Sequence, residues 1–272
     1  MVGTLAQLIA LASFGNAYLD ESSDVEGFYP SNSTFQFCNE ISFVEVKKFL
    51  RVKEKEVAKT PNHWFNYLRT FNCRRLTLKY APTSDPLPDH ISSAFVGGGG
   101  KWYIVSGFFD HADYWLGRWE VTDQEASDNK IWKVTYGKAA TREQLPQSQA
   151  SDLSSTRANL EVVLQQIKAF AQKHELDGFA GCFRKGLGAL SSNNPISLTY
   201  HNDLLPTTGY NLDAKQLIAA ASEAWVFGGM GSWNDLSFDN TIEHQEYERL
   251  SRELYAAINV CVERSVNSFD CK

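Results

Sequence analysis

Apolar and polar residues alternate along much of the first half of the chain, a pattern typical of strands that have one buried face. Two segments, YWLGRWEVT and KIWKVTYG, each place large apolar side chains on one side at a period of two: Trp115, Trp119 and Val121 in the first, and Trp132, Val134 and Tyr136 in the second. The polar connector DQEASDN predicts a turn between them. CRRLTLKY, KWYIVSGFF and ISFVEV alternate similarly, and five such segments predict an antiparallel meander.

Four consecutive glycines, residues 97 to 100, separate ISSAFV from KWYIV. Glycine adopts positive φ without strain, so the run predicts a hairpin turn between two strands. A phosphate-binding loop is the alternative, but it requires a helix to follow the glycines. The segment that follows is strand-like, and the hairpin is therefore favoured.

Beyond about residue 145 the apolar spacing changes to the three-to-four-residue period of helices. A helix is predicted around Leu160 to Ala171, another from a cap at Asp213 to Trp225, and a long final helix. The buried stripe predicted for that last helix consists of Tyr247, Leu250, Leu254, Ile258, Cys261 and Val262.

The segment LAQLIALASF near the N-terminus predicts an amphipathic helix with Leu5, Leu8, Ile9 and Ala12 on one face. The core of a secretory signal is the alternative. No Lys or Arg precedes Lys47, however, so the positive region of such a signal is missing.

These patterns together predict an α+β fold. An antiparallel β-meander sheet in the N-terminal half, about residues 30 to 140, packs against helices mainly from the C-terminal half, about residues 150 to 272. The apolar sheet face needs a cover, so residues 1 to 272 are expected to form a single domain.

Composition narrows the function classes. The formal net charge is −6, which gives no general attraction to nucleic acid or to anionic membranes. The segment RVKEKEVAK alternates its charges and is interpreted as a solvated face. The 5 cysteines are dispersed without a CxxC pair, which favours a reducing, cytoplasmic compartment, with secretion as the alternative. Cys38, Cys73 and Cys182 lie among apolar neighbours, as buried inert thiols do. No cofactor motif is present, so no cofactor is expected.

The segment DHADYW holds Asp110, His111 and Asp113, whose side chains are suited to metal binding or to acid–base chemistry. A polar turn between strands is the alternative. A nearby segment, DPLPDH, adds Asp85, Asp89 and His90. These side chains would lie beside the first group if the intervening strands pair. Since local clustering alone is weak evidence, no metal site is predicted.

The segment WVFGGMGSWNDLSF, residues 225 to 238, contains three glycines within four residues. Gly228 and Gly229 follow a predicted helix, where glycine caps the carbonyl end, and the negative end of the helix dipole disfavours phosphate. Trp233, Asn234 and Asp235 are the candidate binding residues of this loop. The alternative is that Trp233 and Met230 pack into the core. Trp233 is expected to be mostly buried, because tryptophan usually is.

The segment FGGMGSWNDL and the helix EYERLSRELYAAINVCVERSVNSF after it resemble the C-terminal end of uncharacterised bacterial proteins. The resemblance covers about the last fifty residues and implies no activity.

Three functions fit these observations. The first is a non-catalytic protein-binding protein, most concretely a toxin-neutralising immunity protein of a bacterial competition system. It rests on the mild acidity, the abundant aromatics and the lack of a catalytic motif. The second is a small hydrolase or metal-dependent enzyme centred on Asp110, His111 and Asp113. The third is a small-ligand-binding protein with its pocket between sheet and helices.

Overall fold

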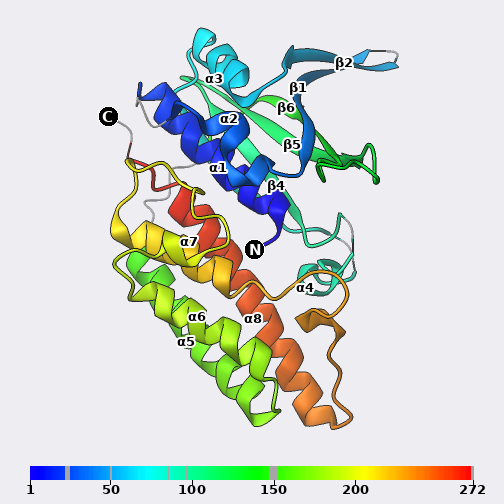
Figure 1. Ribbon diagram of the computed structural model, residues 1–272, viewed down its shortest axis with the longest axis vertical. Coiled ribbons are helices and arrows are strands. Elements are labelled where there is room, and N and C mark those ends of the chain that lie inside the picture. Colours follow the sequence, from blue (N-terminus) through cyan, green and yellow to red (C-terminus); the bar gives the residue numbers. More distant parts are fainter. Residues whose placement is uncertain (22–24, 50, 85, 96, 147–151, 271–272) are drawn as a thin grey trace.

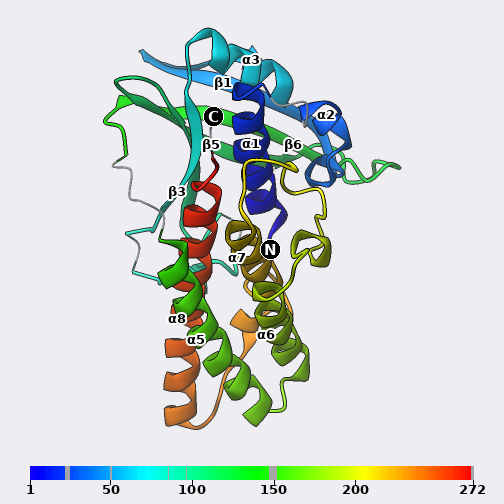
Figure 2. The same cartoon turned by 90° about the vertical axis from the view of Figure 1, so that its left-hand side faces the viewer.

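A single six-stranded sheet forms one end of the molecule, and a bundle of helices extends away from it (Figures 1 and 2). The computed structural model describes residues 1–21, 25–49, 51–84, 86–95, 97–146 and 152–270. The strands are β1 (Cys38–Phe49), β2 (Arg51–Ala58), β3 (Arg75–Ala81), β4 (Lys101–Gly107), β5 (Ala112–Val121) and β6 (Trp132–Glu143). The larger helices are α1 (Gly3–Leu19), α3 (Pro61–Thr70), α5 (Leu153–Lys173), α6 (Asp177–Leu190), α7 (Leu212–Glu223) and α8 (Thr241–Val266). The shorter ones are α2 (Phe28–Ser31), η2 (Ser33–Phe35), α4 (Asp89–Ser92), η3 (Ile196–Leu198) and η4 (Trp233–Asp235).

The sheet has the strand order β2-β1-β6-β5-β4-β3. Strands β3 to β6 form an antiparallel meander, and β1 and β2 form an antiparallel pair at the other edge. Between these two units, β1 pairs with β6 in parallel. The α+β prediction is thus confirmed, but the expected purely antiparallel sheet is wrong, because alternation within a strand does not reveal which distant strand lies beside it.

The predicted pairing of β5 with β6 is confirmed. Trp119 lies opposite Val134 and Val121 opposite Trp132, so the apolar positions of both strands share one face. Val134 and Tyr136 are fully buried on that face. The segment RVKEKEVAK, interpreted only as a solvated face, forms strand β2 as far as Ala58. Because successive side chains of a strand point to opposite faces, its glutamates lie on one side and its lysines on the other.

The glycine run does not join two strands. Short helix α4 precedes it and β4 follows it, so the expected hairpin is wrong. Gly97, Gly99 and Gly100 do adopt positive φ, as the run predicted. The turn redirects the chain from a helix into the sheet, and residues 91 to 95 form no strand.

Helix α1 is the centre of the fold rather than an amphipathic surface helix. Every residue from Leu5 to Ala17 is buried, because α1 lies between the sheet and the helical bundle (Figures 1 and 2). Its polar side chains are hydrogen-bonded accordingly. The Asn16 amide donates to the carbonyl of Leu76 at 2.8 Å and accepts from the amide of Leu76 at 2.7 Å, which fixes α1 against β3.

The predicted helices of the second half are confirmed, with different ends. Asn211, rather than Asp213, caps α7 by accepting from the amide of Ala214. Helix α7 ends at Glu223, so Gly228 and Gly229 lie beyond its cap and do not form it. The predicted stripe of α8 is buried as expected. None of the described helices combines the length and the apolar character needed to cross a bilayer.

Candidate functional site

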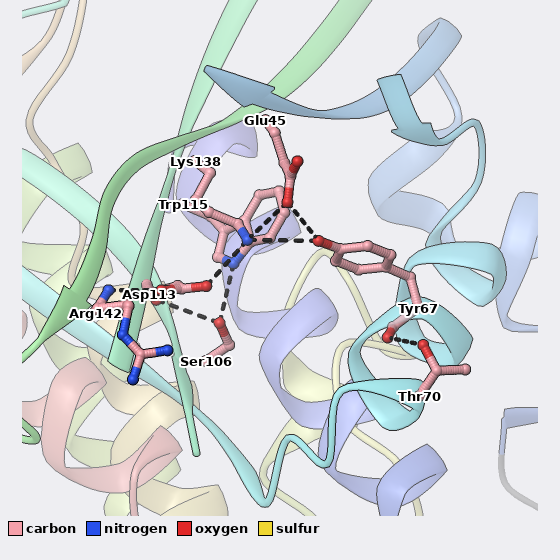
Figure 3. Close-up of polar contacts among 8 residues, drawn as sticks. All are labelled: Glu45, Tyr67, Thr70, Ser106, Asp113, Trp115, Lys138 and Arg142. Atoms are coloured by element: carbon pink, nitrogen blue, oxygen red, sulfur yellow. Dashed lines mark hydrogen bonds and ion pairs between the residues drawn. The ribbon is translucent and has the colours of Figure 1, made fainter. Parts of the chain in front are cut away.

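A charged cluster around Lys138 lies on the helix-covered face of the sheet (Figure 3). Strand register builds it, because Lys138 is the direct partner of Trp115 on β5 and of Glu45 on β1. Asp113 precedes Trp115 by two residues, so both side chains leave β5 on the same face. Tyr67 approaches from α3. Three elements, β1, β5 and α3, therefore converge on one lysine of β6.

The ammonium group of Lys138 contacts both carboxylates. Its Nζ lies 3.0 Å from Asp113 Oδ2 and 3.3 Å from Glu45 Oε1, and 5.1 Å from the ring centroid of Trp115. The Tyr67 hydroxyl donates to Glu45 Oε1 at 2.8 Å. Because the Lys138 side chain is only 10% exposed and that of Asp113 8%, water solvates neither charged group well.

These contacts determine what the cluster can do. Burial, the largest single effect, lowers the pKa of Lys138, but the contacts with Asp113, Tyr67 and Glu45 together outweigh it and raise that pKa. The hydrogen bond from Tyr67, assisted by the charge of Lys138, lowers the pKa of Glu45. A lysine acts as a nucleophile or a base only after it loses its proton. Lys138 therefore remains an ion-pair partner that joins β1, β5, β6 and α3, and is not a reactive amine.

The three residues of DHADYW do not form one constellation. Asp113 faces Lys138 and accepts a hydrogen bond from the backbone amide of Arg142 at 2.9 Å. His111 contacts Asp110 instead of Asp113, with 2.6 Å between its Nδ1 and Asp110 Oδ1. Both lie at the turn before β5. The expected centre on Asp110, His111 and Asp113 is thus divided between a surface pair and a buried ion pair.

The second histidine segment does not complete a metal site either. His90 is 5% exposed and lies on α4 against α8, while the Asp89 carboxylate accepts from Tyr80 and Thr83. Asp85 lies outside the described residues. Within the described parts of the chain, no group of three His, Cys, Asp or Glu side chains is placed to hold a metal ion.

The 225–238 loop is held in place mainly by its own polar residues. Trp233 is 0% exposed, as expected, and its indole nitrogen donates to Ser251 Oγ at 2.7 Å. Asn234 donates to the carbonyl of His90 and so connects the loop to α4. Asp235 is exposed and accepts from the amide of Gly231. Met230 is fully exposed at the loop tip, so the alternative in which it packs into the core together with Trp233 is wrong for Met230.

The opposite face of the sheet contains a polar hollow of about 540 Å³, which we call the trough. Every residue that lines it belongs to a strand, apart from Thr122, which directly follows β5. Its charged residues are Glu40, Glu54, Glu56, Arg118, Glu120 and Lys133. Its buried small residues are Ser42, Val44 and Thr135, which are 5%, 6% and 3% exposed.

Arg118 crosses the trough. It contacts Glu54 through both terminal nitrogens, at 2.9 and 3.3 Å, and Glu120 through Nε at 3.1 Å. Strands β1 and β6 lie between β5 and β2, a separation of about 14 Å at ordinary strand spacing. The Arg118 contact lowers the pKa of Glu54, which keeps that carboxylate charged.

The described cysteines are free thiols. Cys73 is buried, as expected, whereas Cys38 and Cys182 are half-buried. Burial raises the pKa of both Cys73 and Cys261 to about 12, which leaves them unreactive at neutral pH.

No family model matches the chain, and neither the curated proteins nor the solved structures provide a match.

Proposed function

We propose that this chain is a non-catalytic protein-binding protein whose partner contacts the trough. The observation that carries the proposal is a charged hollow on a sheet face, lined almost entirely by strand residues. Specific protein interfaces use such surfaces, with charges arranged to complement those of the partner.

The charges of the trough indicate the chemistry of the partner. Four glutamates and two basic residues line it, an excess of two negative charges. This sign repels the phosphates of nucleic acid and attracts a basic protein segment. A partner Lys or Arg side chain would share Glu54 and Glu120 with Arg118. These carboxylates are half-exposed, so a partner reaches them without unfolding the sheet.

A toxin-neutralising immunity protein is the most concrete form of this proposal. The free thiols support a reducing compartment, and we place the protein in the cytoplasm. A neighbouring gene that encodes a secreted toxin would support this form. A position within an operon of metabolic genes would count against it.

The test is quantitative affinity capture from the native cell, read by mass spectrometry. The trough variant combines Glu54→Gln with Glu120→Gln. The control combines Glu161→Gln with Glu246→Gln, which removes two exposed glutamates from α5 and α8. Both variants change the net charge equally, and exposed charges contribute little to stability. Thermal unfolding confirms that both variants fold.

We expect the wild-type chain and the control to recover the same stoichiometric protein, and the trough variant to recover about tenfold less. That ratio corresponds to about 1.4 kcal/mol shared by two interfacial carboxylates. Equal recovery by all three chains would exclude the trough as the contact surface. Recovery of no stoichiometric protein by the wild-type chain would refute the protein-binding function itself.

A further inference from the structure

Side chains close one edge of the sheet, the edge formed by β3. They accept hydrogen bonds from the backbone N–H groups that β3 directs away from β4: Asn16 bonds to Leu76 at 2.7 Å, Asn267 to Leu78 at 2.7 Å and Glu263 to Tyr80 at 3.0 Å. The two asparagine amides also donate to the carbonyls of Leu76 and Leu78, both at 2.8 Å. With these groups occupied, β3 has no room for a further strand.

Strand β2 forms the other edge of the sheet, and this edge is open (Figure 1). It pairs with β1 in regular register from Arg51 to Glu56. In an antiparallel pair, every second residue directs its N–H and C=O away from the neighbouring strand. Apart from β1, no described residue bonds to the backbone of residues 53 to 56, all four of which are exposed. β2 thus presents unpaired donors and acceptors of the kind to which an extended segment adds.

The side chains of β2 give this edge two faces of opposite charge. Glu54 and Glu56 line the trough, and Lys53 and Lys55 alternate with them, so the lysines point to the other face of the sheet. Lys55 is accordingly the direct partner of Glu45, which belongs to the Lys138 cluster on that face. An added strand would meet carboxylates on one side and ammonium groups on the other.

This arrangement disfavours pairing between two copies of the chain. Two identical edge strands pair antiparallel about a twofold axis normal to the sheet, and such an axis keeps each face on its own side. Glutamates of one copy would then lie opposite glutamates of the other, and lysines opposite lysines, in each register that aligns the four charged residues. Like charges directly opposite each other on paired strands are destabilising. The open edge therefore suits a strand of different sequence.

The trough face determines the chemistry of that strand. The Glu56 carboxylate has an ion pair with Lys59 at 3.8 Å, and both side chains are exposed, at 43% and 78%. Glu54 is also reachable, since its side chain is 37% exposed beside Arg118. Lys or Arg at every second position of an added strand would lie next to both carboxylates, and charges matched in this way select one partner over others.

We propose that the partner adds an extended segment to the open edge of β2, with Lys or Arg at every second residue on the trough face. The backbone of the segment hydrogen-bonds to β2, and its basic side chains pair with Glu54 and Glu56. This inference rests on the proposed protein-binding function and specifies the part of the partner that binds: a basic strand of another protein.

The test measures dissociation constants of synthetic peptides for the full chain by fluorescence anisotropy at one low ionic strength. The first peptide alternates lysine with threonine, which places all its lysines on one face of a strand. The second has the same composition but contains its lysines in one block and its threonines in another, so its lysines divide between both faces. Attraction by net charge alone predicts equal affinity. We expect the alternating peptide to bind about tenfold tighter, because it alone satisfies the backbone and both carboxylates together.

A third peptide tests the backbone hydrogen bonds. It has the alternating sequence with an N-methyl group on one central lysine and one central threonine. The N–H groups of neighbouring residues point to opposite edges of a strand, so one of the two methyl groups faces β2 in either orientation of the peptide. The charge is unchanged. We expect this peptide to bind about tenfold more weakly than the unmethylated form, at the level of the block peptide.

Two variants localise the binding. Glu54→Gln combined with Glu56→Gln removes the two carboxylates of β2, and we expect it to reduce the affinity for the alternating peptide about tenfold. The matched control combines Glu161→Gln with Glu246→Gln on α5 and α8, where both glutamates are exposed, and we expect it to bind as the wild-type chain does.

Each contrary result overturns the proposal. Equal affinity for the alternating and block peptides, or for the methylated and unmethylated ones, excludes strand addition. Absence of binding at millimolar concentrations excludes it as well, and unchanged binding to the Glu54/Glu56 variant places the peptide elsewhere on the molecule. These results leave the trough available to a folded partner, which the affinity capture detects. Capture of no stoichiometric protein, by contrast, refutes the protein-binding function whatever the peptides show.

Discussion

Replacing Lys138 by Met should destabilise the protein far more than the same replacement at Lys133, five residues earlier on the same strand. Lys138 is 10% exposed and its partner Asp113 8%, whereas Lys133 is 37% exposed and its partner Glu40 48%. Removing one member of a buried pair leaves an uncompensated charge and costs about 3–5 kcal/mol, whereas an exposed pair contributes about 0–1 kcal/mol. Asp113 keeps its hydrogen bond from the Arg142 amide, so we expect the lower end, about 3 kcal/mol.

The difference in unfolding free energy between Lys138→Met and wild type should also depend on pH. The folded pKa of Glu45 lies below its unfolded value of about 4.3. Its stabilising contribution is therefore present at neutral pH and is lost as pH falls through the folded pKa. Because Lys138 contributes to the lowered pKa of Glu45, the variant loses less unfolding free energy than wild type as the pH falls. We expect the gap between the two unfolding free energies to narrow below about pH 4.

Urea unfolding followed by tryptophan fluorescence measures both effects. Wild type, Lys138→Met and Lys133→Met are compared at pH 7 and at steps down to pH 3, provided that the urea dependence of each remains two-state. Equal losses for the two variants at pH 7 would refute the claim that burial sets the strength of the cluster. A gap that stays constant across the pH range would refute the role assigned to Glu45.

Three further results are expected. Trp233→Ala should cost about 3–5 kcal/mol of unfolding free energy in urea titrations, since a fully buried indole leaves a large cavity; a loss below about 1 kcal/mol would contradict its burial. Gly99→Ala should lower the thermal midpoint more than Gly97→Ala, because both have positive φ but only Gly99 lacks space for a Cβ, and equal shifts would argue against that crowding. Cys73 and Cys261 should resist iodoacetamide at pH 8 until the protein unfolds, as read by peptide mass spectrometry, because burial raises both thiol pKa values to about 12; rapid labelling of the folded chain would contradict this.

Local periodicity was a good guide to elements and faces but a poor guide to neighbours. Alternation in β5 and β6 correctly identified Trp119 and Val134 as members of one face, because side-chain direction depends only on the strand itself. The parallel pairing of Glu45 with Lys138 joins segments far apart in sequence. No period within either segment carries that information, and so the charged cluster was not predicted.

Two signals of polar groups in the core were nevertheless readable. Lys138 continues the period of Val134 and Tyr136, which places a cation on the apolar side of β6. Asn259 falls between Ile258 and Cys261 in the predicted stripe of α8, where an amide is out of place. A charged or amide side chain at an apolar position of the period marks both groups, whereas clustered histidines and carboxylates mark only Asp110 and His111 at a turn.

The burial of α1 on all sides affects how the chain must be made. The ribosome synthesises α1 before any other helix or strand of the fold. Its Ser13 hydroxyl, however, hydrogen-bonds to the hydroxyl of Tyr210, which is synthesised much later. Helix α8, later still, completes the layer beneath the sheet. At about 5–20 residues per second, the roughly 250 residues between α1 and the end of α8 take about 12–50 s to appear. During that interval β3, β4 and α3 can cover one side of α1, but the side that faces α8 stays exposed. Nascent chains stalled before α8 should therefore bind chaperones strongly and aggregate when released, whereas chains released after α8 should fold.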